Sequence, residues 1–409
     1  MSVLIVGASA AGLSTLEALR RQGYQDPITV LGAETHLPYD RPPLSKQYLS
    51  GIWEADRTSL RPEAMLTALG ADFVLGDAAV ALDVERRTVH TASGRQLSAD
   101  SIVLATGLRP RVLPNQPDLA GVHVLRTLDD AAALRVDLAG ASRMVVVGDG
   151  VLGAEIAATA RKLGLPVTMA GPQAAPLASQ FGPVVAGLLA ELHTAEGVEL
   201  KLGTAVAGLT GVDGRVTGVE LADGEVLPGD VVVVALGATP ATEWLADSGL
   251  TLDNGVVCDS QCRAADGIYA AGDVARWRHD GLDALLRLEN RTNATEQAAC
   301  VAANILGESR SYTPIPYFWT DQFATKIQVH GIPSADAEVT VAEGAIGDRR
   351  FVTHYRRDGR TVAVLGWNMP KQTRLHREHL VHGQAVSGGS PPTALHSARH
   401  LAALEERPR

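Results

Sequence analysis

Two glycine-rich turns of the same kind occur in this chain, one near residue 7 and the other near residue 148. Each follows a short apolar run, Val3–Val6 in the first case and Met144–Val147 in the second, and a helical pattern comes next. An apolar run, closely spaced small residues and a helix are typical of the strand–turn–helix unit that binds a dinucleotide. The start of such a helix offers unpaired N–H groups and a positive dipole end to a pyrophosphate. Because the chain carries the unit twice, we expect two dinucleotides to meet, which indicates redox chemistry between a flavin and a nicotinamide.

The two turns differ at their middle position. The second has glycine at all three motif positions, namely Gly148, Gly150 and Gly153. The first begins at Gly7 and ends at Ala11 and Gly12, but Ser9 stands in the middle. Serine is small enough for close backbone approach, although only glycine takes a positive φ angle without cost. A lone motif also occurs in strand-to-helix connections that bind nothing, but two copies in matching context favour nucleotide binding.

Composition narrows the class of protein. The chain has 409 residues, a net charge of −10, and 46% hydrophobic and 20% charged residues. We therefore expect a globular protein of two or three domains that binds no nucleic acid. No apolar run is long enough for a membrane span, so no membrane partner is expected. The odd set of three cysteines indicates a reducing, cytoplasmic location.

The cysteines also restrict the route of the electrons. Cys258 and Cys262 have three residues between them, which is not the spacing of a dithiol oxidoreductase. No cysteine lies near the first glycine turn, so no thiol is placed to relay electrons from a flavin. The electrons should therefore leave one at a time to an outside centre, or pass directly to a small acceptor.

The order of the patterns predicts an α/β fold. We expect two Rossmann-like dinucleotide-binding domains, as in a glutathione-reductase-like two-domain flavoprotein, plus a C-terminal α+β domain. The predicted limits are 1–113 with 240–313 for a discontinuous FAD-binding domain, 114–239 for an NAD(P)-binding domain, 314–383 for the C-terminal domain and 384–409 for a flexible tail.

Hydrophobic patterns give the expected elements. The predicted strands are 3–6, 28–31, 102–104, 144–147, 167–170, 231–234, 268–273, 326–329, 351–355 and 361–365. The predicted helices are 14–22, 152–163 and 294–306, and a short helix near 398–405.

Four side chains stand where their chemistry could serve a flavin. Glu34 follows the second predicted strand, where a carboxylate accepts hydrogen bonds from a ribose diol. Lys46 ends a rigid Pro-Pro-Leu-Ser-Lys segment, and Glu155 begins the helix after the second glycine turn. Beside a flavin, such a pair would stabilise the anionic reduced ring, although a surface ion pair is the alternative. Asp273 follows Gly272 at a strand end and could accept a hydrogen bond from a sugar-alcohol hydroxyl.

One expected residue is missing from the second unit. Its matching strand runs into Gly171 and Pro172, and no carboxylate follows directly. The usual ribose contact of an NAD site is therefore absent, yet no arginine for a 2′-phosphate replaces it.

Two further candidates have simpler explanations. His376, His379 and His382 are spaced three apart, which could suggest a metal site. They lie among charged residues without an acidic ligand, so we interpret them as a solvated helix face and expect no metal. Trp319 could be a cofactor platform or an ordinary core residue.

Six segments of the chain resemble the oxygenase-coupled, FAD-dependent ferredoxin reductases, a family similar to the rubredoxin reductases. They are 38–46 (PYDRPPLSK), 105–111 (ATGLRPR), 125–131 (LRTLDDA), 270–275 (AAGDVA), 293–297 (NATEQ) and 318–322 (FWTDQ). The resemblance extends from residue 3 to about residue 380, and the Pro-Pro-Leu-Ser-Lys and Trp-x-Asp-Gln segments are specific to this group.

The resemblance implies a role for each matching position. The residues that it implies for FAD are Gly7, Ala11, Gly12, Glu34, Arg41, Lys46, Val80, Arg126, Gly272, Asp273 and Arg291. The residues that it implies for NADH or NADPH are Gly148, Gly150, Gly153, Glu155, Gly237 and Glu289. Lys46, Glu155 and Trp319 would be the catalytic residues, with Lys46 near the flavin N5 and Trp319 on the electron exit side.

The implied activity is transfer of electrons from NAD(P)H through FAD to a small [2Fe–2S] ferredoxin that serves a cytochrome P450 or a Rieske-type oxygenase. We expect an acidic ferredoxin to dock on the basic residues Arg287, Arg291, Lys326, Lys371 and Arg374. Two alternatives stay open: a reductase of a small organic acceptor such as a quinone, and a regulatory flavoprotein with weakened nicotinamide binding.

Three departures from the family pattern bear on the donor. They are Ser9 in the first turn, Gly171 with Ala174 and Ala175 in the second unit, and Arg291 in place of an apolar residue. The choice between NADH and NADPH therefore stays open, as does the choice between a monomer and a homodimer.

Overall fold

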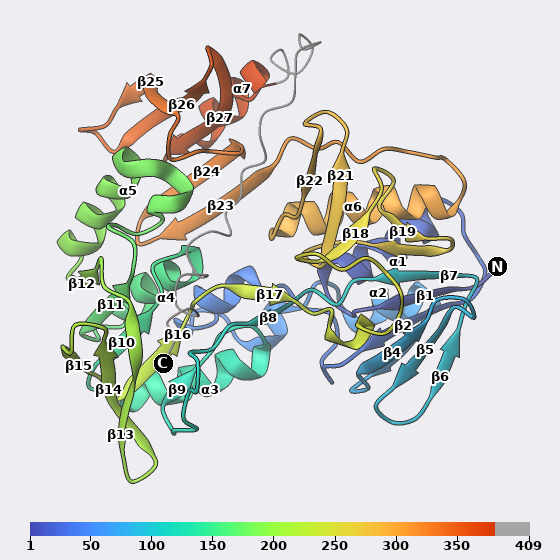
Figure 1. The fold of residues 1–409 in the computed structure, drawn as a ribbon, viewed down its shortest axis with the longest axis horizontal. Helices are drawn as coiled ribbons and strands as arrows, with labels where there is room; N and C mark the ends of the chain where they lie inside the picture. The colour runs from blue at the N-terminus through green and yellow to red at the C-terminus, as the bar shows by residue number, and fades with distance from the viewer. Residues whose placement is uncertain (381–409) are drawn as a thin grey trace, which may run out of the picture.

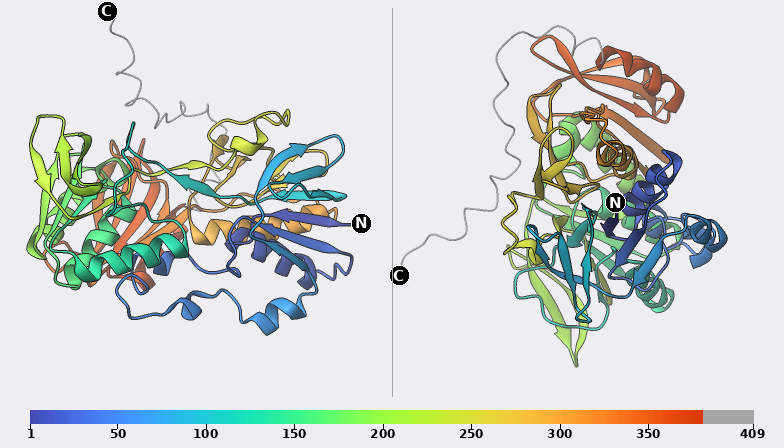
Figure 2. Two further views of the ribbon diagram at one scale, coloured as in Figure 1. Left: turned by 90° about the horizontal axis from the view of Figure 1, so that it is seen from below. Right: turned by 90° about the vertical axis from the view of Figure 1, so that its right-hand side faces the viewer.

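A computed structural model describes residues 1–380, and the predicted tail and the helix near 398–405 lie outside the described residues. Two α/β units stand toward opposite ends of the long axis, and a C-terminal sheet packs beside the second unit (Figures 1 and 2). Within residues 1–380, no helix is both long and apolar enough to cross a membrane.

The first unit is built on a six-stranded sheet with the order β19-β20-β7-β1-β2-β3. Its strands are β1 (Val3–Val6), β2 (Ile28–Gly32), β3 (Asp72–Leu75), β7 (Ser101–Leu104), β19 (Arg263–Ala265) and β20 (Ile268–Ala270). All four residues of β1 are buried, as expected for a central parallel strand that is covered on both faces. The helices α1 (Ala10–Arg21) and α6 (Arg291–Ile305) pack against each other, so segments that precede and follow the second unit in the sequence build the first unit together.

The second unit repeats this design with a five-stranded parallel sheet in the order β12-β11-β10-β16-β9. Its strands are β9 (Val122–His123), β10 (Met144–Val147), β11 (Val167–Gly171), β12 (Val198–Leu202) and β16 (Val231–Val234). Its helices are α3 (Leu128–Gly140), α4 (Val151–Lys162) and α5 (Ala178–Ala195). The strand register is also repeated, since Val6 pairs with Leu31 and Val147 pairs with Ala170.

Two short strands run between the units. The chain passes from the first unit to the second through β8 (Leu108–Pro110) and returns through β17 (Ala238–Pro240). These two strands pair antiparallel. Smaller antiparallel sheets complete the two units. Their strands are β4 (Ala79–Asp83), β5 (Thr88–Thr91), β6 (Gln96–Ser98), β13 (Val206–Val212), β14 (Arg215–Leu221) and β15 (Val226–Pro228).

A third small sheet has mixed pairing, with β18 (Val256–Cys258) parallel to β21 (Ala275–His279) and β22 (Ala284–Leu286) antiparallel to it. The remaining short helices are η1 (Pro42–Ser45), η2 (Ala55–Thr58), α2 (Glu63–Ala68) and η3 (Glu243–Leu245).

The C-terminal part is an antiparallel five-stranded sheet that carries one helix. Its order is β23-β24-β27-β26-β25, with β23 (Tyr317–Gln322), β24 (Thr325–Gly331), β25 (Glu338–Ala345), β26 (Arg350–Arg357), β27 (Arg360–Trp367) and α7 (Pro370–His376). The buried Phe351 and Trp367 belong to the same apolar cluster as Val146 and Ile156 of the second unit. This shared core brings β23 against α4 and so beside the second glycine turn.

The predicted fold class is confirmed. The errors concern element ends, such as the strand predicted over 268–273, which ends at Ala270, and whole elements without a prediction, such as α5. The helix predicted over 14–22 begins four residues earlier, because it starts directly after the turn at Ser9. The pattern also missed α3, although Thr127 and Asp130 form the reciprocal capping box that marks its start. The strands β23 and β25 were missed as well. The predicted domain limits stay a prediction, and the sheets described above are consistent with a first unit in two pieces.

Candidate active site

The glycines at the start and end of each turn are required by close backbone contacts. Gly7 and Gly148 have φ angles of +126° and +127°. A Cβ atom on Gly7 would lie closer than 3.0 Å to the carbonyl of Ala105, and one on Gly148 would meet the carbonyl of Ala235 in the same way. Gly12 and Gly153 would each place a Cβ against the carbonyl of the first glycine of its own turn. Both turns therefore bring the helix start as close to the strand as the backbone allows.

The middle position of each turn is less restricted. Ser9 and Gly150 are the residues that precede the helices α1 and α4, and their φ angles are −121° and −85°. These angles are open to any residue, and a Cβ on Gly150 would meet nothing within 4 Å. The serine in the first turn is therefore compatible with the backbone that the motif needs.

A cavity of about 490 Å³ lies between the two turns, within the usual size range of a ligand site. It is lined by residues of the first turn, such as Ala11, and by Gly150 of the second turn. The other predicted site residues that line it are Arg41, Lys46, Arg126, Glu155, Gly237, Gly272, Asp273, Glu289, Arg291 and Trp319. A space bounded by two nucleotide-type turns fits a flavin and a nicotinamide placed against each other.

The remaining predicted residues do not line this cavity. Gly7, Gly12, Gly148 and Gly153 take part in the backbone contacts of the turns, and Glu34 lies beyond the end of β2. Val80 is on β4 with its surface about half exposed. Its assignment to FAD therefore stays a prediction.

Lys46 and Glu155 meet in the cavity wall. The Lys46 Nζ lies 2.6 Å from Oε2 of Glu155, and their side chains are only 14% and 8% exposed. Glu155 also accepts hydrogen bonds from the hydroxyls of Ser45, at 2.6 Å, and Thr320, at 2.9 Å. Two separate segments, η1 with the adjoining Lys46 and β23, therefore hold the carboxylate that α4 carries. A surface ion pair, the alternative for Lys46 and Glu155, is excluded by their burial.

Sequence reasoning missed Ser45 and Thr320 as partners of Glu155. Ser45 stands next to Lys46 in the Pro-Pro-Leu-Ser-Lys segment, and Thr320 stands inside the Trp-x-Asp-Gln segment. Their position inside these two family-specific segments is the sequence feature that could have indicated a role in the site.

Asp273 and Arg126 form a second charged pair in the wall, with Nη2 of Arg126 3.3 Å from Oδ2 of Asp273. Burial raises the pKa of Asp273, and the charge of Arg126 only partly offsets this effect. The pKa of Arg126 is lowered, first by burial and then by the neighbouring Arg41. Arg287 reaches the backbone carbonyl of Asp273 at 3.2 Å and pairs with Glu289 at 2.7 Å.

Glu34 is held by two neighbours near the end of β2. Its carboxylate accepts hydrogen bonds from Arg41, at 2.7 Å, and from the hydroxyl of Tyr39. Burial by itself would raise the pKa of Glu34, but Arg41 and Tyr39 outweigh it and hold this pKa below its ordinary value. The carboxylate is therefore ionised and oriented, as a ribose acceptor has to be.

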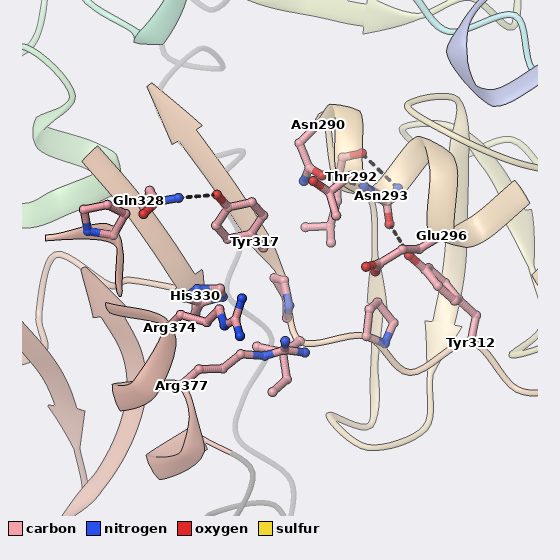
Figure 3. Close-up of a pocket in the computed structure, with 15 residues that line it drawn as sticks. Asn290, Thr292, Asn293, Glu296, Tyr312, Tyr317, Gln328, His330, Arg374 and Arg377 are labelled. Atoms are coloured by element: carbon pink, nitrogen blue, oxygen red, sulfur yellow. Dashed lines mark hydrogen bonds between the residues drawn. The ribbon is translucent and has the colours of Figure 1, made fainter. Parts of the chain in front are cut away.

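A smaller cavity of about 260 Å³ separates α6 from the C-terminal sheet (Figure 3). His330, Arg374 and Arg377 line it on one side, and Glu296 lines it on the other. Burial and the charge of Arg377 lower the pKa of His330 to about 4. Tyr317 lines this smaller cavity and stacks on Trp319 of the larger one, with ring centroids 6.1 Å apart.

The five residues predicted to dock a ferredoxin do not form one exposed set. Arg287 and Arg291 are tied in ion pairs to Glu289 and Asp40. The exposed members are Lys326, Lys371 and Arg374.

The cysteines and histidines lie away from the larger cavity. Cys258, Cys262 and Cys300 are buried and unbridged, and none of them lines it. The expectation of a solvated histidine face is wrong for His376, which packs together with His379 against His354 of β26. His382 lies outside the described residues.

Comparisons with known proteins agree with this geometry. The pyridine nucleotide-disulphide oxidoreductase family model matches residues 1–298, and the reductase C-terminal model matches residues 317–390. The rhodocoxin reductase of Rhodococcus erythropolis is 36% identical over 93% of this chain and 89% of its own length. The ferredoxin reductase component of the chlorobenzene dioxygenase of a Cupriavidus species is 38% identical over 90% of both chains.

Solved structures give the same result. The covalent complex of putidaredoxin reductase with putidaredoxin contains a chain that is 33% identical, with a TM-score of 0.89 and coverage of 93% of both chains. With these matches along most of its length, the chain belongs to the pyridine nucleotide-disulphide oxidoreductase family, among its ferredoxin reductases.

Proposed function

We propose that this protein passes electrons from NAD(P)H through FAD to a small [2Fe–2S] ferredoxin, which serves a cytochrome P450 or a Rieske-type oxygenase. The observation that carries the proposal is the single cavity lined by both glycine turns and by the Lys46–Glu155 pair. The names of two relatives point the same way, since one is a dioxygenase component and the other forms a complex with putidaredoxin.

The first unit would hold FAD and the second would hold the nicotinamide donor. We assign the adenosine half of FAD to Gly7, Ala11, Gly12 and Glu34, and its remainder to Arg41, Lys46, Val80, Arg126, Gly272, Asp273 and Arg291. We assign the donor to Gly148, Gly150, Gly153, Glu155, Gly237 and Glu289. FAD, when bound, supplies the ability to accept two electrons together and to release them singly.

Lys46 supplies the positive charge in this arrangement. Its ammonium group places a positive charge in the cavity wall, where it would stabilise negative charge on a reduced flavin ring. Glu155 fixes the ammonium group, and the hydroxyls of Ser45 and Thr320 in turn fix Glu155. Because these contacts hold the ammonium group in one position, the site needs little reorganisation when charge develops beside it.

Trp319 lies at the cavity edge that belongs to the C-terminal sheet, and we assign this edge as the exit for electrons. Lys326, Lys371 and Arg374 are exposed on the same domain and would attract an acidic ferredoxin. We also propose that the protein works in the cytoplasm, since its three cysteines are free and buried.

Anaerobic stopped-flow spectroscopy of the purified protein tests the proposal. We expect a yellow protein whose flavin absorbance is bleached by a nicotinamide donor and restored by an oxidised [2Fe–2S] ferredoxin. Ferredoxin reduction should slow as ionic strength rises, because exposed charges steer the encounter. A colourless protein would refute the FAD assignment, and a bleached flavin that only a quinone or dye reoxidises would favour the small-acceptor alternative. A flavin that neither NADH nor NADPH reduces would favour a regulatory role.

A further inference from the structure

The ends of the two nucleotide units correspond residue by residue. Val6 pairs with Leu31 in the first unit, and Val147 pairs with Ala170 in the second. Counting on from these pairs, Gly171 is the equivalent of Gly32, and Gln173 is the equivalent of Glu34. The same register matches Ala8 of the first turn with Asp149 of the second. The second unit thus has an amide where the first has its acid, and an acid where the first has alanine.

Asp149 occupies the space that a side chain at the end of β11 would fill. A Cβ atom on Gly171 would lie closer than 3.0 Å to both Cγ and Oδ2 of the Asp149 carboxylate. In the first unit, a Cβ on Gly32 would meet the methyl group of Ala8 instead, at 2.8 Å. A carboxylate therefore does lie at the end of β11, but it belongs to Asp149 of the turn and not to residue 171.

The carboxylate is held in this place by Gln173. The backbone N–H of Gln173 donates to Oδ2 of Asp149 at 2.8 Å, and its side-chain amide donates to Oδ1 at 2.5 Å. The backbone N–H of Ser179 donates to the Gln173 oxygen at 2.6 Å, which fixes that amide. A carboxylate has about four acceptor positions, so Asp149 can accept further hydrogen bonds beside the two from Gln173.

No cation balances this charge nearby. Asp149 is 6% exposed, and no lysine, arginine or histidine nitrogen of residues 1–380 lies within ion-pair distance of it. A buried, unpaired carboxylate is costly, and it stands in a turn whose helix favours anions. Hydroxyl donors of a ribose diol would offset this cost.

We infer that Asp149 is the ribose acid of the second site and that it selects NADH over NADPH. It would accept hydrogen bonds from the adenosine ribose, and it would repel the negative charges of a 2′-phosphate. This inference rests on the proposed function, because it assumes that the second turn binds the nicotinamide donor.

Calorimetry with the FAD-loaded protein tests the inference without turnover. The probes are ADP-ribose and 2′-phospho-ADP-ribose, and the variant is Asp149→Asn. We expect the unaltered protein to bind ADP-ribose at least about tenfold more tightly, since a hydrogen bond to a charged group contributes about 1.5–3 kcal/mol. The variant should lose about tenfold in affinity for ADP-ribose and gain affinity for the phosphorylated probe. The KM for NADH should rise with little change in kcat.

Two controls keep the inference open to refutation. Asp213→Asn removes the same charge in the exposed turn between β13 and β14, where asparagine tolerates the φ angle of +52°, and should change nothing. Moving the acid in Asp149→Ala/Gly171→Asp should restore discrimination between the probes. Equal weakening of both probes by Asp149→Asn would leave Asp149 only a loop-positioning residue and overturn the inference. If the unaltered protein bound neither probe, the proposed function would fail instead.

A second, independent observation concerns three histidines of the C-terminal domain. His354 of β26 has its Nε2 2.8 Å from Nδ1 of His376 at the end of α7. With His379, each of the three offers a ring nitrogen, and these atoms lie within 4.8 Å of one another. The other nitrogen of His376 lies 3.2 Å from a carboxylate oxygen of Glu343 on β25.

This contact orients His376 for a metal. A carboxylate that accepts the Nε2–H proton leaves the lone pair on Nδ1, which faces the other two rings. Three imidazoles are a ligand set that suits a divalent first-row metal such as Zn²⁺. We propose that these histidines bind such an ion and tie the C-terminal end of α7 to β26.

Titration of the chelator-treated protein with Zn²⁺ tests this site. We expect one high-affinity ion per chain and a raised Tm, both lost in His354→Gln and in His376→Gln. His330→Gln, which changes a buried histidine of the same domain, should keep the ion. No binding, or binding that survives both ligand variants, would overturn the proposal.

Discussion

The two nucleotide units share a backbone and differ in their side chains at the ribose end. In both units the first and last glycines of the turn press against backbone carbonyls, and the strand register is the same. In the first unit, Glu34 comes from beyond the strand and is tied to Arg41. In the second, Asp149 of the turn places a carboxylate against Gly171 at the end of the matching strand, where Gln173 holds it. The comparison teaches that close packing fixes the turn, whereas the carboxylate that we propose for the ribose can come from either side of it.

The largest effect should come from adding one methyl group to the first glycine of each turn. Gly7→Ala and Gly148→Ala both force a side chain onto a positive φ angle and into a carbonyl group. We expect each to cost more than about 1 kcal/mol of stability. Gly7→Ala should lose FAD, whereas Gly148→Ala should stay yellow and lose reduction by NADH. Absorbance spectra and stopped-flow traces distinguish them.

Gly140→Ala is the control for this pair, because its Cβ would meet nothing within 4 Å and its φ angle is not positive. If Gly148→Ala also released the flavin, the two units would not bind separate nucleotides as proposed.

The next largest effect should come from the carboxylate that joins the units. Glu155→Gln keeps the shape of the side chain, but it leaves the buried ammonium group of Lys46 without its counter-charge. We expect flavin reduction by NADH to slow by a factor on the order of 10², with a loss of about 3 kcal/mol of stability. Stopped-flow kinetics and thermal unfolding measure the two effects.

Thr320→Val is the matched variant, since it removes one hydrogen bond to Glu155 and no charge. Its effect on flavin reduction should be clearly smaller. Equal effects of the two variants would mean that the charge of Glu155 is unimportant.

A smaller effect should come from adding a methyl group at Gly171, the end of β11. Gly171→Ala pushes a methyl group into the Asp149 carboxylate, and such overpacking costs about 1–3 kcal/mol. We expect weaker NADH binding with FAD retained, and partial recovery of stability in Gly171→Ala/Asp149→Ala. Fluorescence titration with NAD⁺ and unfolding curves are the measurements. Normal NAD⁺ affinity in Gly171→Ala would show that the contact is irrelevant to the ligand.

The smallest effect should appear on acidification. The folded-state pKa of Glu34 is below its ordinary value, so its ion pair stabilises the protein above pH 4.5. This contribution is lost as the pH falls through the lowered pKa. Glu34→Gln should therefore flatten the acid limb of stability and of FAD retention, as followed by flavin fluorescence between about pH 6 and pH 3.5. An unchanged acid limb would contradict the assignment.

Residues within one short segment were largely predictable. The two turns, Lys46, Glu155 and Asp273 follow from local patterns and from the resemblance to ferredoxin reductases, and the cavity brings these three side chains together. The substitute acid at Asp149 was not found, because its proximity to Gly171 depends on the pairing of β10 with β11. The contact between His354 and His376 was not predicted either, because the two residues lie on different elements, β26 and α7.

The sequence by itself determined that this chain builds two strand–turn–helix units, since glycine spacing and apolar runs act over a few residues. Only the tertiary structure decided which side chains meet. Lys46 and Glu155 are 109 positions apart, and Thr320 is 165 positions from Glu155. Such contacts depend on how whole elements pack, and a shared apolar core between α4 and the C-terminal sheet brings these elements together. Backbone preferences are local, whereas the partners of a buried charge are set by long-range packing.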